Sequence, residues 1–209
     1  MPAGPGCLNR GQRPPLRCPG PRSLGSRTVS QSSLLYNFDI DLSDVDRGVY
    51  ERLALRVACH ASETAEHLVA RVLAYCLELT EGLSFGPGLA EPDQPSLAVR
   101  DLTGELQAWI DVGAPDTARL HRASKAARRV AVYTHKDPAL LVRQCAGERI
   151  HRAHAIRLHA FDRTLIAGLA ARLQRRTAFA LSVNEQHLYV TIGDTLLSGA
   201  VELHALGDG

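Results

Sequence analysis

The sequence predicts an α/β fold in which a mixed β-sheet is flanked by helices and carries additional antiparallel strands. Three observations support this fold class. Alternating apolar residues mark two strands at residues 35–42 and 53–59, and apolar residues at helical spacing follow in residues 63–78. Strand-like and helix-like segments then alternate over residues 96–173, an order typical of a mixed sheet. Strand-like segments without helices occupy residues 177–204, which predicts a meander.

The boundaries of the elements are marked by turn and capping residues. Asp44 to Asp46 forms a turn between the first two strands, and Ser62 offers an N-cap for the first helix, which ends before Gly82. The segment 113–116 is a strand-to-helix turn with Pro115 near the first helical position. The remaining strands are expected at 96–100, 105–110, 130–134, 155–161, 177–183, 187–192 and 196–204, and the remaining helices at 115–128, 137–149 and 162–173.

The composition is that of one globular domain preceded by an atypical segment. Of the 209 residues, 45% are hydrophobic and 22% charged, and we place a single domain at residues 34–209. Residues 1–33 are rich in Pro, Gly, Ser and Arg and have no periodic apolar face, so no packed structure is expected there. Three interpretations of this extension remain open: an organelle presequence, a disordered tail, or an artefact of start-codon assignment with the natural chain beginning near Val29.

Charge and hydropathy exclude several classes of protein. Residues 1–38 hold five arginines and no acid, so the 19 basic and 22 acidic residues that remain make the folded part slightly acidic. A generally basic nucleic-acid-binding surface is therefore excluded, and any contact with phosphate has to be local. No run approaches the roughly 18–20 apolar residues of a membrane span. We expect a cytoplasmic protein without a membrane partner, and the sequence does not indicate a protein partner.

Cysteines and histidines give no pattern typical of a structural metal site. The five cysteines include no CxxC pair, which argues against a disulfide framework and a zinc knuckle and favours a reducing compartment. His151, His154 and His159 cluster in sequence, but in a segment rich in arginine this spacing is more typical of a polar surface.

Two aspartates are expected to meet at the open end of a β-hairpin. A two-residue loop at 102–103 would place residue 94 opposite Asp111, so that Asp93 and Asp111 lie together. Opposed positions are about 4.5–5.5 Å apart at Cβ, close enough for two carboxylates to share a divalent cation. Asp101 lies at the turn, about 23 Å away at roughly 3.3 Å per residue, and cannot share that cation. The alternative is an ordinary hairpin whose terminal aspartates are solvated.

Two glutamates near the start of the first helix are candidates for a third carboxylate. With Val69 at the centre of the buried face and about 100° per residue, Glu66 falls about 60° from the centre and Glu63 about 120°. Glu66 is therefore better placed to direct its carboxylate over the sheet. Alternatively, both glutamates merely favour the positive end of the helix. A helix acid together with Asp93 and Asp111 is the oxygen-rich set that binds magnesium and activates water for attack on a phosphodiester.

Three segments, at residues 62–66, 88–95 and 109–120, resemble the YaeQ family of bacterial proteins, and the resemblance extends from about Tyr36 to the C-terminus. That family is similar in fold to the PD-(D/E)xK nucleases, which implies a restriction-endonuclease-like core. The resemblance also implies Mg²⁺ or Mn²⁺ as a cofactor and nucleic acid as a substrate or partner. Mapped by motif, Glu66 or Glu63 takes the place of the helix acid, Asp93 that of the PD aspartate and Asp111 that of the second acid. Glu66, Asp93 and Asp111 would then be the metal ligands.

This chain departs from the family pattern at a position that matters for catalysis. The lysine expected two residues after Asp111 is Gly113, and relatives commonly carry Asp-Glu-Pro where this chain has Asp93-Gln94-Pro95. In the nuclease scheme that lysine holds the attacking water and offsets charge on the phosphate. Arg119 is one turn into the next helix and can clamp phosphate, although it stays protonated. Lys125 is the second choice, about 15 Å along that helix at roughly 1.5 Å per residue.

Two hypotheses follow for the function. The first is a magnesium-dependent phosphodiesterase acting on nucleic acid, for which Glu63, Glu66, Asp93, Asp111, Arg119 and Lys125 are the candidate catalytic residues. The second is a catalytically degenerate nuclease-like fold that binds protein or nucleic acid. The retained acids favour the enzyme, whereas Gly113 favours the binding module. Fold resemblance alone does not decide between them.

Overall fold

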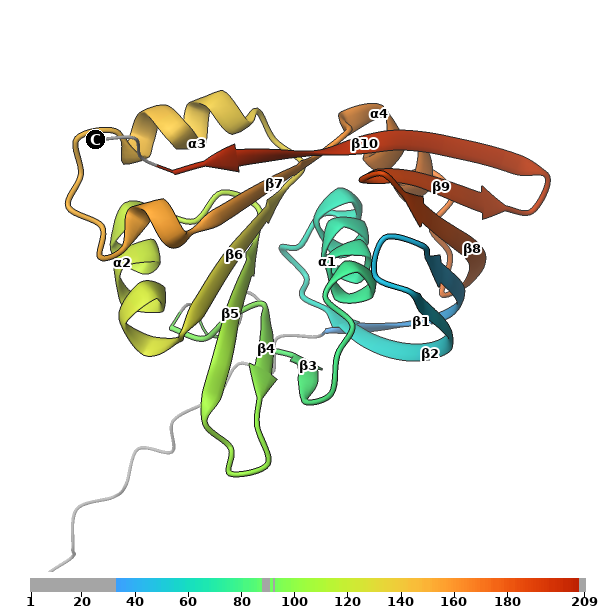
Figure 1. Ribbon diagram of the computed structural model, residues 1–209. Helices are drawn as coiled ribbons and strands as arrows, with labels where there is room; N and C mark the ends of the chain where they lie inside the picture. The colour runs from blue at the N-terminus through green and yellow to red at the C-terminus, as the bar shows by residue number, and fades with distance from the viewer. Residues whose placement is uncertain (1–32, 88–90, 92, 207–209) are drawn as a thin grey trace, which may run out of the picture. The chain divides into compact units, whose positions relative to one another are not determined.

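In the computed structural model, which describes residues 33–87, 91 and 93–206, a ten-stranded sheet curves around the helix α1 (Ala65–Leu77) (Figure 1). The strands are β1 (Leu34–Asp44), β2 (Val49–Cys59), β3 (Leu83–Phe85), β4 (Leu97–Arg100), β5 (Leu106–Val112), β6 (Arg129–Thr134), β7 (Arg157–Phe161), β8 (Arg176–Asn184), β9 (His187–Ile192) and β10 (Thr195–Ala205). Their spatial order is β2-β1-β8-β9-β10-β7-β6-β5-β4-β3. The pairs β1–β8, β5–β6 and β6–β7 are parallel, and the other pairs are antiparallel. The predicted mixed α/β sheet with additional antiparallel strands is confirmed.

Each helix begins at a side chain that caps its free backbone N–H groups. Thr64 accepts a hydrogen bond from the backbone of His67 at the start of α1. Asp116, Asp137 and Asp162 cap the other three helices in the same way. The helices begin one or two residues later than predicted, because the capping residues precede them, and they end one to four residues earlier. The other helices are α2 (Thr117–Ala126), α3 (Pro138–Cys145) and α4 (Arg163–Ala170).

Helices cover both faces of the parallel part of the sheet, and the alternation of side chains along the strands accounts for this. Ile110 and Tyr133 point inward, into a core shared with α1 and α4. Trp109 and Val132 point outward, into a second core shared with α2 and α3. Because both faces of β5 and β6 are buried, the two strands read in the sequence as nearly continuous apolar runs.

The loop between β4 and β5 is one residue longer than predicted. Gly104 donates from its backbone N–H to Asp101 O (2.9 Å) and adopts φ 86°, and Asp101 in turn donates to Glu105 O (3.1 Å). This is a turn followed by a glycine in the left-handed region, a common three-residue hairpin loop. The side chain of Asp101 stays at the turn, where it accepts from the backbone of Thr103 (2.9 Å). The prediction that Asp101 lies at the turn is confirmed.

A β-bulge adds a second shift of register. Val99 pairs with Ala108 but Arg100 pairs with Leu106, so that Gln107 has no partner across the ladder. Together with the longer loop, the bulge moves the register by two residues. The predicted opposition of residue 94 and Asp111 is therefore wrong. The position opposite Asp111 belongs to Ser96, because the neighbouring pair is Leu97 with Ile110.

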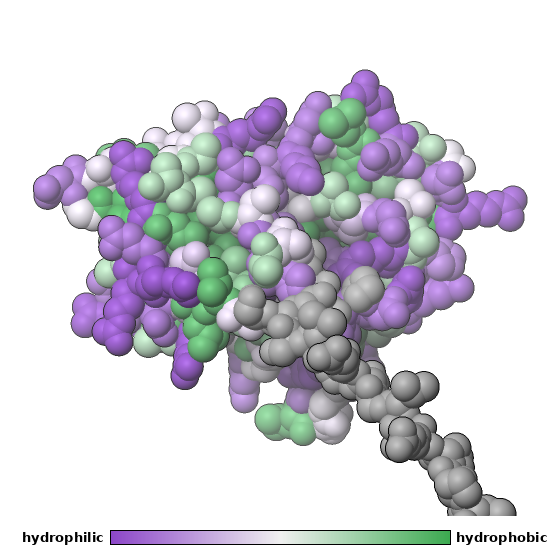
Figure 2. All heavy atoms as spheres, turned by 180° about the vertical axis from the view of Figure 1, so that it is seen from behind, coloured by the Kyte–Doolittle hydropathy of each residue, from purple (hydrophilic) through white to green (hydrophobic). Residues whose placement is uncertain are grey.

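Figure 2 shows the molecule from behind, where hydrophilic side chains surround smaller hydrophobic areas. Within the described ranges, none of the helices combines the length and apolar character needed to cross a membrane. Residues 1–32 and Pro92 lie outside the described residues. The interpretations of the N-terminal extension therefore stay predictions.

Candidate functional site

A cavity of about 500 Å³ lies where the parallel strands β5 and β6 end. The carboxyl ends of parallel strands are where ligands commonly bind in α/β folds, because the loops that follow leave a crevice there. The lining comes from the start of α1, the start of β4, the turn from β5 into α2 and the segment after β6. It consists of Ser62, Glu63, Thr64, Glu66, His67, Ser96, Val112, Gly113, Ala114, Pro115, Asp116, Arg119, His135 and Lys136.

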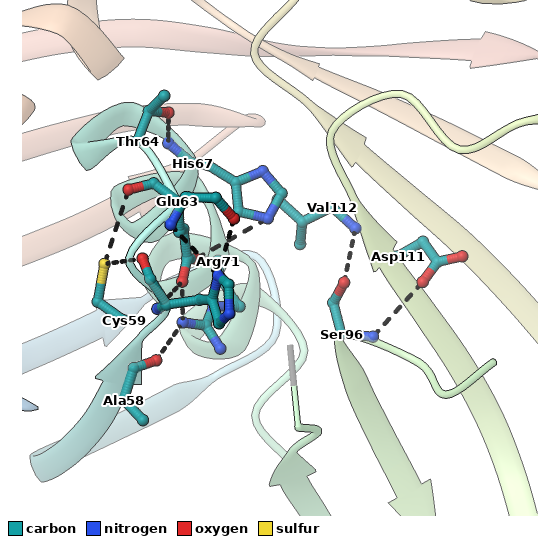
Figure 3. A network of polar contacts seen from close by, with 11 residues as sticks. Ala58, Cys59, Glu63, Thr64, His67, Arg71, Ser96, Asp111 and Val112 are labelled. Carbon is teal, nitrogen blue, oxygen red and sulfur yellow. Dashed lines mark hydrogen bonds and ion pairs between the residues drawn. The ribbon is translucent and has the colours of Figure 1, made fainter. Parts of the chain in front are cut away.

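Asp111, which the sequence predicts as a metal-binding acid, is buried beside this cavity and paired with Arg119. Its side chain is 1% exposed. Arg119 donates to both carboxylate oxygens, from Nε to Oδ2 at 2.7 Å and from Nη2 to Oδ1 at 2.6 Å. The backbone N–H of Ser96 is a further, longer donor at 3.4 Å (Figure 3). Such a two-point contact between guanidinium and carboxylate is strong and fixes the orientation of both groups.

Asp93, the other aspartate of the predicted pair, is not buried with Asp111. Its side chain is 78% exposed and forms an ion pair with Arg122, one turn beyond Arg119 on α2. Each aspartate therefore has its own arginine on the same helix. The predicted meeting of Asp93 and Asp111 fails because the hairpin loop is one residue longer than expected and the ladder contains a bulge.

Both glutamates predicted as candidates line the cavity, but Glu63, and not Glu66, is the buried one. The Glu63 side chain is 2% exposed, and its Oε2 accepts from Nη2 of Arg71 at 2.9 Å (Figure 3). Glu66 is exposed in the first turn of α1 and lines the cavity. Helical angles do not apply to Glu63, because the helix begins after Thr64 and Glu63 precedes it. Burial raises the pKa of Glu63, and the ion pair with Arg71 opposes that effect.

Arg71 ties the start of α1 to the end of β2. Its side chain is 3% exposed, and Nη2 also donates to Ala58 O at 2.7 Å. The Cys59 thiol lies beside the same network, 3.8 Å from the carbonyl oxygen of Glu63, and burial raises its pKa. Glu63 is therefore a structural partner of a buried arginine in this arrangement.

Two histidines that sequence patterns did not single out line the cavity. The rings of His67 and His135 are 6.0 Å apart and nearly perpendicular. Burial lowers the pKa of His67 to about 4 and also lowers that of His135. Both imidazoles are therefore neutral near pH 7. The signal in the sequence was weak: His67 lies near the start of the predicted helix, four residues after Glu63, and His135 directly follows the buried strand β6.

Gly113 occupies the position of the expected lysine for a conformational reason. Its φ of 98° is one that side chains other than glycine rarely adopt, and its N–H donates to Tyr133 O at 2.8 Å. A Cβ at this position would lie 3.3 Å from the ring of His67. A lysine here would be strained.

The structure also distinguishes the two lysines of the chain. Lys125 is exposed near the end of α2 and does not line the cavity, whereas Lys136 does. Arg119 lines it as well, next to Asp111. Lys136 is thus a cation at the cavity that sequence reasoning missed, because it lies on a loop outside the family motifs.

The residues do not fit a magnesium site. Among the residues that the structure describes, no group of three or more His, Cys, Asp or Glu side chains could hold a metal ion. Both oxygens of Asp111 accept from Arg119, and Asp93 is exposed beside Arg122. The predicted ligand set Glu66, Asp93 and Asp111 is therefore not brought together as one group.

The family model described as "YaeQ protein" matches residues 29–200. The chain belongs to the YaeQ family. The YaeQ proteins of Escherichia coli (strain K12) and Salmonella typhi are each 32% identical over 111 residues, which are 53% of this chain and 61% of the relative. The aligned part thus spans less than two thirds of these YaeQ relatives. The resemblance inferred from the sequence is confirmed at the level of the family.

Solved YaeQ structures share the fold. The crystal structure of YaeQ from Xanthomonas axonopodis pv. citri is 28% identical, with a TM-score of 0.76 over 84% of this chain and 100% of that chain. The YaeQ structure from Pseudomonas syringae, also 28% identical, has a TM-score of 0.74 over 85% of this chain and 97% of that chain.

Proposed function

We propose that this YaeQ-family chain is a binding module with a restriction-endonuclease-like core, and that the cavity at the ends of β5 and β6 holds a phosphate group of a nucleic acid. One observation carries the proposal. The acid that would bind a metal in a nuclease, Asp111, instead holds the guanidinium of Arg119 by both oxygens. Asp111 thereby fixes the guanidinium at the cavity wall and balances its charge, so Arg119 would contribute a positioned hydrogen-bond donor and not a free charge.

Lys136 supplies the second contact in this proposal. It is exposed at the cavity, and within the described ranges it takes part in no ion pair. A lysine ammonium is a flexible point charge that can reach phosphate without a fixed geometry. Lys136 and Arg119 together would form a local grip on phosphate, as the near-neutral charge of the folded part requires.

The nearby helix ends do not offer further phosphate sites. The N-termini of α2, α3 and α4 lie at the same end of the strands as the cavity, since each helix follows one of the parallel strands β5, β6 and β7. Asp116, Asp137 and Asp162 each accept from one backbone N–H group in the first turn, and their carboxylates place a negative charge there that disfavours phosphate. Phosphate binding must therefore rely on side chains, which makes it sensitive to single substitutions.

A fluorescence anisotropy titration tests the proposal with labelled single-stranded DNA, RNA and duplex DNA in EDTA, in magnesium and in manganese. We expect binding that does not require the metal and no cleavage of the oligonucleotide. Lys136→Ala should weaken binding, whereas Lys125→Ala, which removes the other lysine of the chain, should leave it unchanged. The proposal would be contradicted if the wild type bound none of the three nucleic acids. It would also be contradicted if Lys136→Ala and Lys125→Ala lost equal amounts of binding affinity.

A phosphodiesterase is the second candidate, and one observation favours it. His67 lines the same cavity, and burial keeps its imidazole neutral by lowering its pKa to about 4. A neutral imidazole can accept a proton from an attacking water, although a pKa of about 4 makes His67 a weaker base than an ordinary histidine. Cleavage by the wild type that is lost in His67→Gln, with the fold intact, would establish this candidate instead.

A further inference from the structure

A second and larger cavity, of about 790 Å³, lies at the other end of α1, where β5 and β6 begin. Its lining includes Leu77 and Glu78 from the end of the helix and Ala108 and Arg129 from the strands. The volume is within the range of about 300–1,000 Å³ that is usual for small-molecule sites. Because the first cavity lies at the opposite ends of these strands, this cavity is independent of the function proposed above.

The lining comes from the inner face of the sheet and the end of α1. Ala108 lies beside Arg129 in the pairing of β5 with β6, and both residues line the cavity. The small side chain of Ala108 leaves room between the sheet and the end of α1. One row further along, His159 lies between Tyr133 and Leu203 on the same face.

Two guanidinium groups are fixed at the wall of this cavity. Arg47 donates to Asp44 (2.6 Å) and to the carbonyl oxygen of Cys76 at the end of α1 (2.9 Å). Arg129 forms an ion pair with Glu78, a carboxylate that is only 8% exposed. Side chains held in this way lose little conformational entropy when a ligand binds.

A third arginine, Arg157, gives the lining of the cavity a net positive charge. Arg157 is exposed at the lining, and among the described residues it has no ion pair. The charges of Arg47 and Arg129 are balanced by Asp44 and Glu78. Arg157 therefore leaves one positive charge for a ligand to balance.

Flat and apolar groups form the floor next to these charges. The ring of His159 stacks on Tyr133 with 4.6 Å between centroids and 9° between planes. Leu203, 49% exposed, lies next to His159 in the sheet. Burial lowers the pKa of His159, so the ring is neutral near pH 7 and does not repel an apolar body. A planar group can extend such a stack favourably.

We propose that this cavity binds a small aromatic organic anion, whose ring lies against His159 and Leu203 and whose acidic group pairs with Arg157. The apolar floor would hold the ring, and the uncompensated arginine would select for negative charge. The apolar floor and the uncompensated Arg157 lie in one cavity of suitable size, and this combination predicts an aromatic anion as the ligand.

The test uses 1-anilinonaphthalene-8-sulfonate as the probe and N-phenyl-1-naphthylamine, which lacks the sulfonate, as its neutral counterpart. Fluorescence titration of the folded chain should show saturable one-to-one binding of the anion. Arg157→Ala should weaken it by about tenfold, which is the loss of one hydrogen bond to a charged group. Leu203→Glu, a change at a half-exposed position, should also weaken binding of the anion, because it places a second negative charge in the cavity.

Arg143→Ala is the matched control, because Arg143 is exposed on α3 and does not line the cavity. It should leave the affinity for the anion unchanged, and Arg157→Ala should not alter binding of the neutral probe. Urea unfolding of each variant confirms that the fold is retained. The proposal is overturned by a wild type that does not bind the anion saturably, or by equal affinities of the Arg157→Ala variant and the wild type.

Discussion

Replacing Arg119 by methionine tests the claim that Asp111 is a buried partner of arginine. Asp111 is 1% exposed and would lose two charge-assisted hydrogen bonds of 2.6 and 2.7 Å, keeping only the 3.4 Å contact with the Ser96 backbone. Removing one member of a buried ion pair costs about 3–5 kcal/mol, because the other charge stays buried without a partner. For a domain of this size that corresponds to a fall in melting temperature of about 10 °C.

The assay is urea unfolding followed by circular dichroism, with Arg122→Met as the control. Arg122 pairs with Asp93, but the two side chains are 50% and 78% exposed, and such surface pairs contribute about 0–1 kcal/mol. Replacing both buried partners, by Asp111→Leu with Arg119→Met, should restore much of the stability, since no charge is left unpaired. A loss in Arg119→Met as small as that in Arg122→Met would refute the reasoning.

Three further predictions concern the same end of the sheet. Because the folded pKa of His67 is about 4 and the ordinary value is 6.5, the unfolded chain takes up the proton first, and stability should fall as pH decreases from about 6.5 to about 4. His67→Gln should remove up to about 3 kcal/mol of that dependence, measured by urea unfolding at stepped pH. Gly113→Ala should cost about 1–3 kcal/mol through backbone strain and contact with the His67 ring, and Gly48→Ala, with no atom within 4 Å, should cost less in the same unfolding assay. Glu63→Gln should lower the free energy of unfolding by about 3–5 kcal/mol, because it leaves Arg71 unpaired. Glu66→Gln should change it by less than about 0.5 kcal/mol. Equal thermal stability of these two variants would contradict the assignment of Glu63 as the buried partner of Arg71.

The order of strands and helices could be predicted from the sequence because it depends on local periodicity. The buried faces of β5 and β6 read as apolar runs. The helix starts were less exact: the predicted N-cap Ser62 is wrong, since Thr64 caps α1, and Asp137 and Asp162, predicted as the first helical residues, are N-caps. The short strand β3 was missed, since three residues show no period. The place of β8 beside β1 could not be predicted either, because that pairing joins distant segments.

The candidate site was predicted in part. Arg119 was expected within reach of the strand end that carries Asp111, and the two side chains are in contact, but their mutual ion pair depends on how closely α2 approaches β5. Asp93 was placed wrongly because a one-residue error in loop length and one bulge move a hairpin register by two residues. His67 was missed because its neutrality follows from burial, which a sequence pattern does not show.

The salt dependence of duplex DNA binding tests the central claim most directly. The logarithm of the binding constant should fall linearly with the logarithm of the salt concentration, with a slope set by the number of phosphate contacts. Lys136→Ala should make that slope shallower by about 1, and Lys125→Ala should keep the slope of the wild type. Identical slopes for the wild type and Lys136→Ala would contradict a phosphate grip at this cavity.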